Sequence, residues 1–133
     1  MKIKSLVYWI VRMVAAIIML QTLYFKFSGA EESVYRFSTV GMEPWGRIGG
    51  GIFELLASIL ILFNATAWIG ACIALGLMGG AISMHLTILG ISVRGDHGQL
   101  FYYAVTVALC SLVILYFNRD KILSISKSIL TKG

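Results

Sequence analysis

The sequence is poor in charge, proline and cysteine. Only 13% of its 133 residues are Asp, Glu, Lys or Arg, about half the quarter that soluble domains carry. With 59% of the chain hydrophobic, a soluble domain of this length could not cover its apolar surface. A single proline excludes a collagen-like chain, and two cysteines are too few for a disulfide scaffold or a four-cysteine zinc site. The composition therefore predicts a membrane protein.

Long stretches with little or no charge predict where the chain crosses the membrane. A spanning helix needs about 20 mainly apolar residues, and the charge-poor stretches fit four spans, at about 5–25, 46–63, 66–92 and 99–117. Asn64-Ala65-Thr66 supplies the turn between the second and third spans. The apolar residues are continuous rather than alternating, which excludes membrane β-strands. We expect an all-α, four-transmembrane-helix bundle in which residues 1–133 form a single integral membrane domain.

The first span shares two features with a cleaved signal peptide. It begins with the basic segment Met1-Lys2-Ile3-Lys4 and is followed by the small residues Ser28-Gly29-Ala30. However, its apolar segment is longer than that of a signal peptide and is interrupted by Arg12. We therefore expect the first span to be retained as a membrane helix.

The distribution of charge predicts the orientation of the spans. Four spans place both termini on one side, together with the basic residues Lys2, Lys4, Arg119, Lys121, Lys127 and Lys132 and the acidic residue Asp120. On the other side the basic and acidic residues cancel: Lys26, Arg36, Arg47 and Arg94 against Glu31, Glu32, Glu43 and Asp96. This bias predicts that both termini are cytoplasmic. No basic stripe with interleaved aromatics is present, so we expect membrane lipids rather than nucleic acid as partners of the +5 net charge.

Two segments outside the spans have amphipathic patterns. In the first outer loop, Ser28 can cap a short helix at about 31–40 that carries acids in its first turn, and we expect this helix to lie at the membrane interface. Pro44 and Trp45 then begin the second span. After the fourth span, isoleucines recur at helical spacing in residues 118–133, which predicts a basic amphipathic tail on the inner surface.

Two formal charges fall deep inside the predicted spans, away from their ends. Arg12 lies near the middle of the first and Glu54 near the middle of the second, and their signs are opposite. Because an isolated charge is costly in a membrane, we predict a buried ion pair between Arg12 and Glu54. Such a pair either fixes helix register without any chemistry or forms part of a functional site.

Further polar residues extend this prediction to a pocket. Glu54 lies on a helical stripe with Arg47, Gly50, Gly51 and Ser58, and His85 ends a similar stripe of small residues in the third span. We expect Arg12 and Glu54 deep in the pocket, His85 above them, and Lys26 and Arg47 at its rim. His85 is either a hydrogen-bonded core residue or part of a proton relay.

We expect neither a metal site nor a thiol active site. The remaining histidine, His97, is in an outer loop, so the spans offer no histidine pair for haem or a metal ion. Cys72 and Cys110 have similar predicted depth but form no Cys-x-x-Cys motif, and buried cysteine usually acts as a small apolar filler. Gln21 is on the opposite side of its helix from Arg12 and would face another helix or a second copy of the chain.

With these residues assigned, the chain resembles the DoxX-like family of small four-span bacterial membrane proteins. The matching segments are Arg12 to Gly29, Gly41 to Leu62, Gly70 to Gly90, Leu100-Phe101 and Asn118-Arg119. The resemblance implies a location in the bacterial cytoplasmic (inner) membrane. The family's matching polar positions are Arg12, Lys26, Glu54 and His85.

The function implied by this resemblance is coarse. The family takes its name from a subunit associated with thiosulfate:quinone oxidoreductase, which implies a membrane subunit, or a module that binds a quinone or a lipid head group, alongside membrane or peripheral oxidoreductase subunits. The sequence shows no catalytic or redox centre of its own, so enzymatic activity stays open, and a redox role would need a bound quinone or a partner. The alternative is a small proton-coupled transporter acting as a homodimer, although pairing of Glu54 with Arg12 would hinder its protonation.

Overall fold

The computed structural model describes residues 2–29, 31–43, 45–91 and 98–132, and all regular structure in these ranges is helical. Several residues used in the sequence analysis lie outside these ranges: Met1, Ala30, Pro44, Arg94, Asp96 and His97. The helices are α1 (Lys2–Phe27), α2 (Glu31–Thr39), α3 (Trp45–Leu62), η1 (Asn64–Thr66), α4 (Ala67–Met84), η2 (His85–Leu89), α5 (Gln99–Phe117) and α6 (Arg119–Lys132).

Four helical segments are long and apolar enough to cross a membrane within the described chain. They cover Ile3–Tyr24, Trp45–Leu62, Asn64–Leu89 and Gln99–Phe117, which confirms the four predicted spans. The predicted turn at residues 64–66 is the short 3-10 helix η1. The third span does not end as a plain α-helix. Its last turn, η2, is a π-helical turn that continues α4. It stops at Gly90, whose φ of 79° favours glycine.

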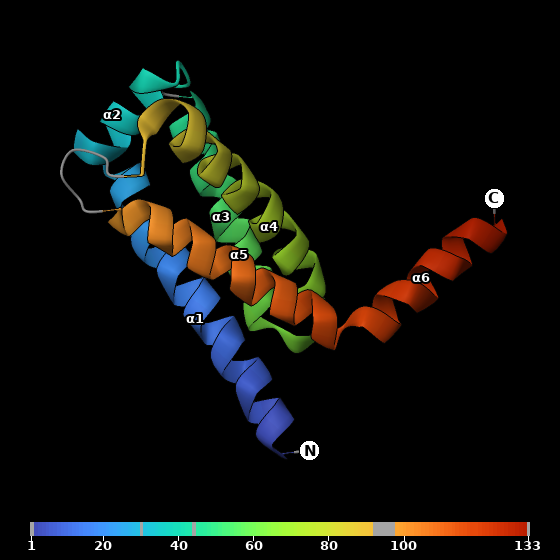
Figure 1. The fold of residues 1–133 in the computed structure, drawn as a ribbon. Coiled ribbons are helices and arrows are strands. Elements are labelled where there is room, and N and C mark those ends of the chain that lie inside the picture. Colours follow the sequence, from blue (N-terminus) through green and yellow to red (C-terminus); the bar gives the residue numbers. More distant parts are fainter. Residues whose placement is uncertain (1, 30, 44, 92–97, 133) are drawn as a thin grey trace.

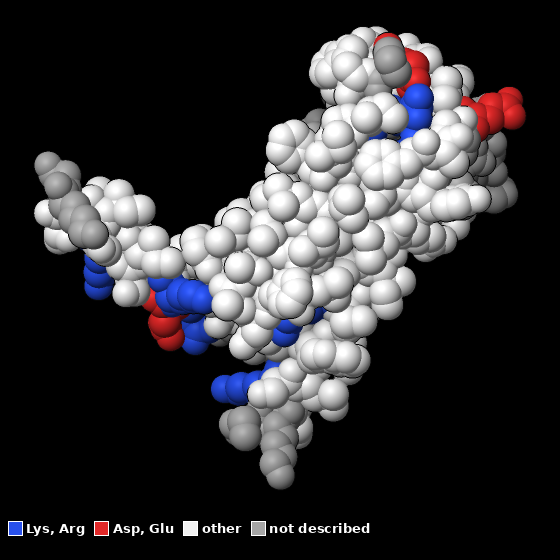
Figure 2. Space-filling model, turned by 180° about the vertical axis from the view of Figure 1, so that it is seen from behind, with Lys and Arg blue, Asp and Glu red and all other residues white. Residues whose placement is uncertain are grey.

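The four long helices form a ring in the order α1, α3, α4, α5, with each helix packed against its two neighbours (Figure 1). One end of the bundle holds the N-terminus of α1, the connection η1 and the junction of α5 with α6, and we call it the terminal end. The opposite end is covered by α2, and we call it the α2 end. On the face shown in Figure 2, charged residues gather toward these ends and a broad uncharged surface separates them, as a membrane protein requires.

The centre of the bundle is rich in alanine. Buried side chains come from all four long helices: Ala15, Ala16 and Met19 of α1, Ala57 and Ile61 of α3, Ala67, Ala71, Ala74 and Met78 of α4, and Ala104, Val107 and Ile114 of α5. Small side chains allow membrane helices to pack closely, since no hydrophobic effect drives them together in lipid. Contact is tightest at Gly70, where a Cβ atom would lie 2.7 Å from the carbonyl oxygen of Ala57.

The two predicted amphipathic helices are both present. The helix expected at 31–40 is α2, which covers the bundle next to α1, α3 and η2. The tail is α6, which points away from the bundle in Figure 1 and exposes Leu123, Ile129 and Leu130. Their positions at the two membrane surfaces stay predictions.

Candidate functional site

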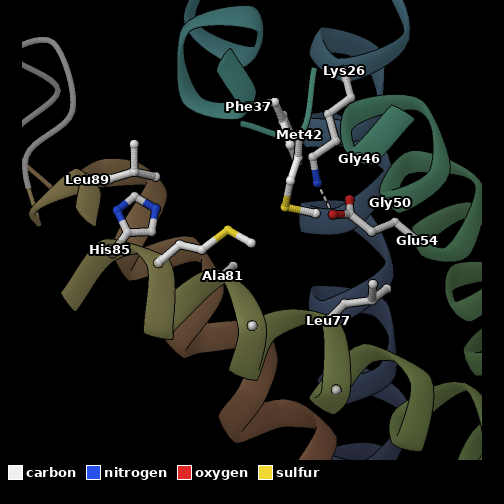
Figure 3. A pocket seen from close by; sticks show the side chains of 13 residues that line it. Lys26, Phe37, Met42, Gly46, Gly50, Glu54, Leu77, Ala81, His85 and Leu89 are labelled. Atoms are coloured by element: carbon white, nitrogen blue, oxygen red, sulfur yellow. Dashed lines mark hydrogen bonds and ion pairs between the residues drawn. The ribbon is translucent and has the colours of Figure 1, made fainter. Parts of the chain in front are cut away.

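The buried acid of the predicted site, Glu54, forms its ion pair with Lys26 and not with Arg12. The Lys26 ammonium donates a hydrogen bond to Glu54 Oε1, and both residues are buried, with 7% and 2% of their surfaces exposed. Lys26 was expected at the rim of the pocket. Instead, its side chain runs from the last turn of α1 into the bundle and reaches Glu54 on α3 (Figure 3).

Thr22 completes the surroundings of the Glu54 carboxylate. Its hydroxyl proton is shared between two acceptors, Glu54 Oε2 at 3.2 Å and the carbonyl oxygen of Met19 at 3.0 Å. Thr22 and Lys26 are one helical turn apart on α1, so a single face of that helix supplies both partners of the carboxylate. Thr22 was not among the predicted site residues, although its i, i+4 spacing from Lys26 was a usable signal.

Arg12 occupies a separate site at the terminal end of the bundle. Its Nε donates to the carbonyl oxygen of Ile61 and its NH2 donates to that of Leu62, both at 2.8 Å. These carbonyls belong to the last turn of α3, where backbone oxygens have no partner within the helix and the helix dipole is negative. The Arg12 guanidinium also lies over the Tyr8 ring, 5.1 Å from its centroid. Arg12 therefore caps α3, and the predicted Arg12–Glu54 pair is wrong.

Helix length explains the error. The prediction placed the midpoints of the first and second spans at the same depth, but α1 has 26 residues and α3 has 18. The extra turns of α1 extend beyond α3 at the terminal end (Figure 1). Thr22 is therefore level with Glu54, and Arg12 is level with Leu62, since both intervals cover about 12–15 Å at about 1.5 Å per residue.

Arg47 mirrors the role of Arg12 at the other end of the bundle. Its NH1 donates to the carbonyl oxygen of Lys26 in the last turn of α1, and its Nε and NH2 bond the carboxylate of Glu43 at 2.8–3.0 Å. Each of the helices α1 and α3 thus has at least one carbonyl of its last turn bonded by an arginine from the other. Arg47 lies close to the predicted rim, but its side chain does not line the cavity described below.

His85 is buried at the start of the π-helical turn, with 2% of its surface exposed. Its Nδ1 lies 2.9 Å from the carbonyl oxygen of Gly90, and its ring meets Phe101 edge-on with centroids 5.7 Å apart. Because a carbonyl only accepts hydrogen bonds, Nδ1 must carry the proton. The prediction of a hydrogen-bonded core histidine is therefore confirmed for one ring nitrogen, and the other faces a cavity.

A cavity of about 220 Å³ brings Lys26, Glu54 and His85 together. We call it the polar cavity. It is lined by Lys26, Phe37, Met42, Gly46, Gly50, Glu54, Gly76, Leu77, Gly80, Ala81, Met84, His85 and Leu89. Figure 3 shows the Lys26–Glu54 pair on one wall and His85 on the other, with Met42 between α2 and the ion pair. A second cavity, of about 40 Å³, lies against Lys26, Glu54 and His85 on the α5 side.

Three glycines leave space in the polar cavity rather than closing it. A Cβ atom at Gly50, Gly76 or Gly80 would meet no heavy atom within 4 Å. Small residues in these stripes were expected to serve helix packing, and Gly70 does so. Pattern alone cannot separate the two roles, because an absent side chain can admit either a neighbouring helix or a ligand.

In the part of the chain that the structure describes, metal-binding and thiol side chains are not gathered at this site. Within the described chain, no three His, Cys, Asp or Glu side chains are grouped so that they could hold a metal ion. Cys72 and Cys110 are both free, and Cys72 is exposed. Gln21 is exposed on the surface of the single chain, which leaves its predicted contact with a second copy untested.

The comparison with known proteins agrees with this architecture. The family model of DoxX matches residues 7–90, which is more than half of the chain and includes all five residues of the predicted pocket. No curated protein and no solved structure matches the chain. With four helices able to cross a membrane and a matching family model, the chain belongs to the DoxX family and is a small multi-pass integral membrane protein.

Proposed function

We propose that this protein is a non-catalytic membrane module that binds the polar head group of a quinone or a lipid in the polar cavity. The observation that carries the proposal is the placement of a buried ion pair and a buried histidine on the walls of one cavity. Apolar pockets with a few convergent polar groups are the usual form of small-molecule sites. A purely structural ion pair would need no adjacent cavity.

The chemistry of the walls fits a small polar head. Lys26 offers ammonium donors, Glu54 offers carboxylate acceptors, and His85 offers one ring nitrogen. Thr22 and Lys26 hold the carboxylate in place, so the site is ordered before a ligand arrives. Apolar residues such as Leu77 and Leu89 form the rest of the lining and would contact carbon atoms of the ligand.

Retention of small molecules during purification tests this proposal. We expect mass spectrometry of the gently purified wild-type protein to find a co-purifying quinone or lipid. The Glu54→Gln variant should lose it, because Lys26 then loses its charge partner and the cavity wall rearranges.

The matched control is Arg12→Gln, which also removes one internal charge but does so at the terminal end, away from the polar cavity. If the ligand is retained equally by wild type and Glu54→Gln, or lost equally from both variants, the polar cavity is not its binding site.

The proton-coupled transporter is the competing function. It would require Glu54 to take up and release a proton in every cycle, and each cycle would break the buried pair with Lys26. That cost disfavours transport. Proteoliposomes with an imposed pH gradient test it directly, and Glu54-dependent flux of a cationic or neutral substrate would replace our proposal with this one.

A role beside oxidoreductase subunits is part of the same proposal. Affinity purification from the native membrane should then recover a redox protein whose absorbance shows haem or flavin, while the purified chain alone shows neither. Recovery of the chain without any redox protein would contradict this role.

We further propose that the protein resides in a bacterial cytoplasmic membrane with both termini inside. The bias of basic residues toward the terminal end supports this orientation, and Arg12 adds to it. A reporter fused after Gly133 that is active only in the cytoplasm should be active. Activity of a reporter that works only after export, fused at the same position, would show the opposite orientation.

A further inference from the structure

The exposure of the glycines that line the polar cavity indicates that it opens between α3 and α4. On the α4 wall, Gly76 and Gly80 are both exposed, and on the α3 wall Gly50 is half-buried. No heavy atom would lie within 4 Å of a Cβ at any of the three positions. Gly76 is close to the middle of the span Asn64–Leu89, so this opening lies at the depth of the hydrocarbon core.

The volume of the cavity restricts what can fill it. Pockets that enclose a whole small ligand measure about 300–1,000 Å³, and the polar cavity measures about 220 Å³. It can therefore hold a head group but not the rest of a lipid-sized molecule. A tail attached to that head would leave through the glycine-lined opening, where it meets the acyl chains of the bilayer.

His85 provides a second and independent observation that points to a ligand. Among the described residues, its Nε2 has no hydrogen-bond partner, although the ring is buried and lies on the cavity wall (Figure 3). Since Nδ1 donates its proton to Gly90, Nε2 of the neutral ring is an acceptor. A buried acceptor without a partner is costly, and a donor from a ligand would satisfy it.

The charge balance of the walls excludes a strongly charged head group. The Lys26 and Glu54 charges cancel, and Arg12 and Arg47 do not line the cavity. An anionic head, such as a phosphate, would enter a low-dielectric cavity without an uncompensated cation to balance it. The walls therefore match a neutral head that donates a hydrogen bond, and a hydroxyl group has this chemistry.

We propose that the ligand is a neutral lipid with a hydroxyl group on its head, which enters from the bilayer between α3 and α4 and donates its hydrogen bond to His85 Nε2. The inference rests on the head-group binding proposed above and narrows the ligand to one chemical class. Two kinds of molecule share this chemistry, tailed hydroquinones and neutral glycerolipids.

Matched pairs of probes test the hydroxyl requirement and separate the two sources. Protein in phosphatidylcholine nanodiscs is titrated with 1-monooleoylglycerol and with methyl oleate, which has the same acyl chain and no hydroxyl. A second titration, without oxygen, compares a decyl-tailed hydroquinone with its quinone. We expect the hydroxyl-bearing member of a pair to bind about tenfold more tightly, as the loss of one hydrogen bond implies. The pair whose hydroxyl-bearing member binds more tightly shows whether the natural ligand is a hydroquinone or a glycerolipid. The anionic probe 1-oleoyl-lysophosphatidate should bind weakly.

Neighbouring glycines test the route through the opening. Gly80→Leu should fill the opening and reduce binding of the preferred probe by at least about tenfold. We expect it to leave the fold intact, since a Cβ at this position would meet no heavy atom of another helix within 4 Å. Gly79→Leu is the matched control, because Gly79 is adjacent and also exposed, and a Cβ there would likewise meet no heavy atom within 4 Å, but Gly79 does not line the polar cavity. Equal binding by the two variants would overturn the proposed route.

The outcomes separate this inference from the proposed function. Equal binding of both members in each pair, with loss in Glu54→Gln, would overturn the hydroxyl requirement and leave head-group binding intact. Tighter binding of the lysophosphatidate would assign an anionic ligand and also overturn the inference. If no probe binds and no small molecule co-purifies, both proposals fail.

Discussion

The two ends of the bundle each contain a buried cation from α1, but they use it differently. At the terminal end, Arg12 is held by two backbone carbonyls of α3 and the Tyr8 ring, in a region where α3 and α4 touch at Gly70. At the α2 end, Lys26 pairs with Glu54 on the wall of a cavity that is also lined by Gly50, Gly76 and Gly80, where an added Cβ would meet no heavy atom within 4 Å. A buried charge therefore marks a candidate site only where space adjoins it.

The difference arises from how the partners are supplied. The carbonyls that bind Arg12 exist at the end of every helix and need no special residue. Lys26 needs a carboxylate, and a carboxylate inside a membrane is costly unless it is paired. The terminal end can thus be maintained by packing and capping alone. The α2 end retains a polar cluster that packing does not require.

The largest effect is expected from removing one member of the ion pair. Glu54→Ala should destabilise the protein by about 3–5 kcal/mol, because Lys26 stays buried without its partner. The double variant Glu54→Ala with Lys26→Met should recover much of that loss. Unfolding by SDS titration in mixed micelles measures both values. If Glu54→Ala alone is as stable as wild type, Lys26 is not left without a partner, and water or a lipid phosphate must already reach it.

Arg12 offers the corresponding test at the terminal end. Arg12→Gln should cost about 1.5–3 kcal/mol, since two charge-assisted hydrogen bonds to the end of α3 are lost. Unlike the ion pair, this loss should not be recovered by substituting Glu54, because the two residues are not in contact. The same titration measures a double variant in which Arg12 and Glu54 are both substituted. Partial recovery of stability in it would show that the two ends are energetically coupled and would contradict this prediction.

Glycine substitutions compare the packing of the two ends. Gly70→Ala should destabilise the protein by about 1–3 kcal/mol, as overpacking does, because the added methyl group would overlap the Ala57 carbonyl and Ile61. Gly76→Ala, on the same helix, should be neutral or slightly stabilising. Thermal unfolding in detergent measures the pair, and equal losses would contradict a tight helix contact at Gly70 and an open cavity wall at Gly76.

The smallest effect is expected at the contact that joins α1 to the end of α5. Tyr8→Phe removes the hydroxyl that Asn118 Nδ2 bonds at 2.8 Å and should cost about 0.5–1.5 kcal/mol. Tyr116→Phe is the control, because Tyr116 is exposed and its ring can keep its contact with Arg119. A ligand-binding assay should detect no effect of either change. That result would show that the Tyr8–Asn118 contact acts only at the terminal end and does not influence the polar cavity.

The fold was predictable to a large extent, whereas the site was predictable only in part. Charge-poor stretches located all four spans, since bilayer thickness fixes how many apolar residues a helix needs. Glu54 and His85 were recognised because polar groups are costly in a membrane. Their partners were not, because pairing depends on the relative depth of two helices, and the prediction assumed a common midpoint for α1 and α3.

Lys26 shows the limit of arguments from position. It is the last charge before the first outer loop and was assigned to the surface by that criterion. Its side chain instead turns inward, because the last turn of α1 is covered by α2 and by Arg47, and Glu54 provides a closer partner than water. A long lysine side chain can reach several ångströms along its helix in either direction.

The sequence by itself determined that this chain has four membrane-spanning helices and that Glu54 and His85 are internal. Those conclusions follow from the transfer cost of single residues, which depends only on residue type and spacing. The tertiary structure alone decided which cation pairs with Glu54, which glycines pack and which leave a cavity, and that Arg12 caps a helix. Each of these depends on the axial offset between neighbouring helices, and that offset is set by helix length and side-chain packing together.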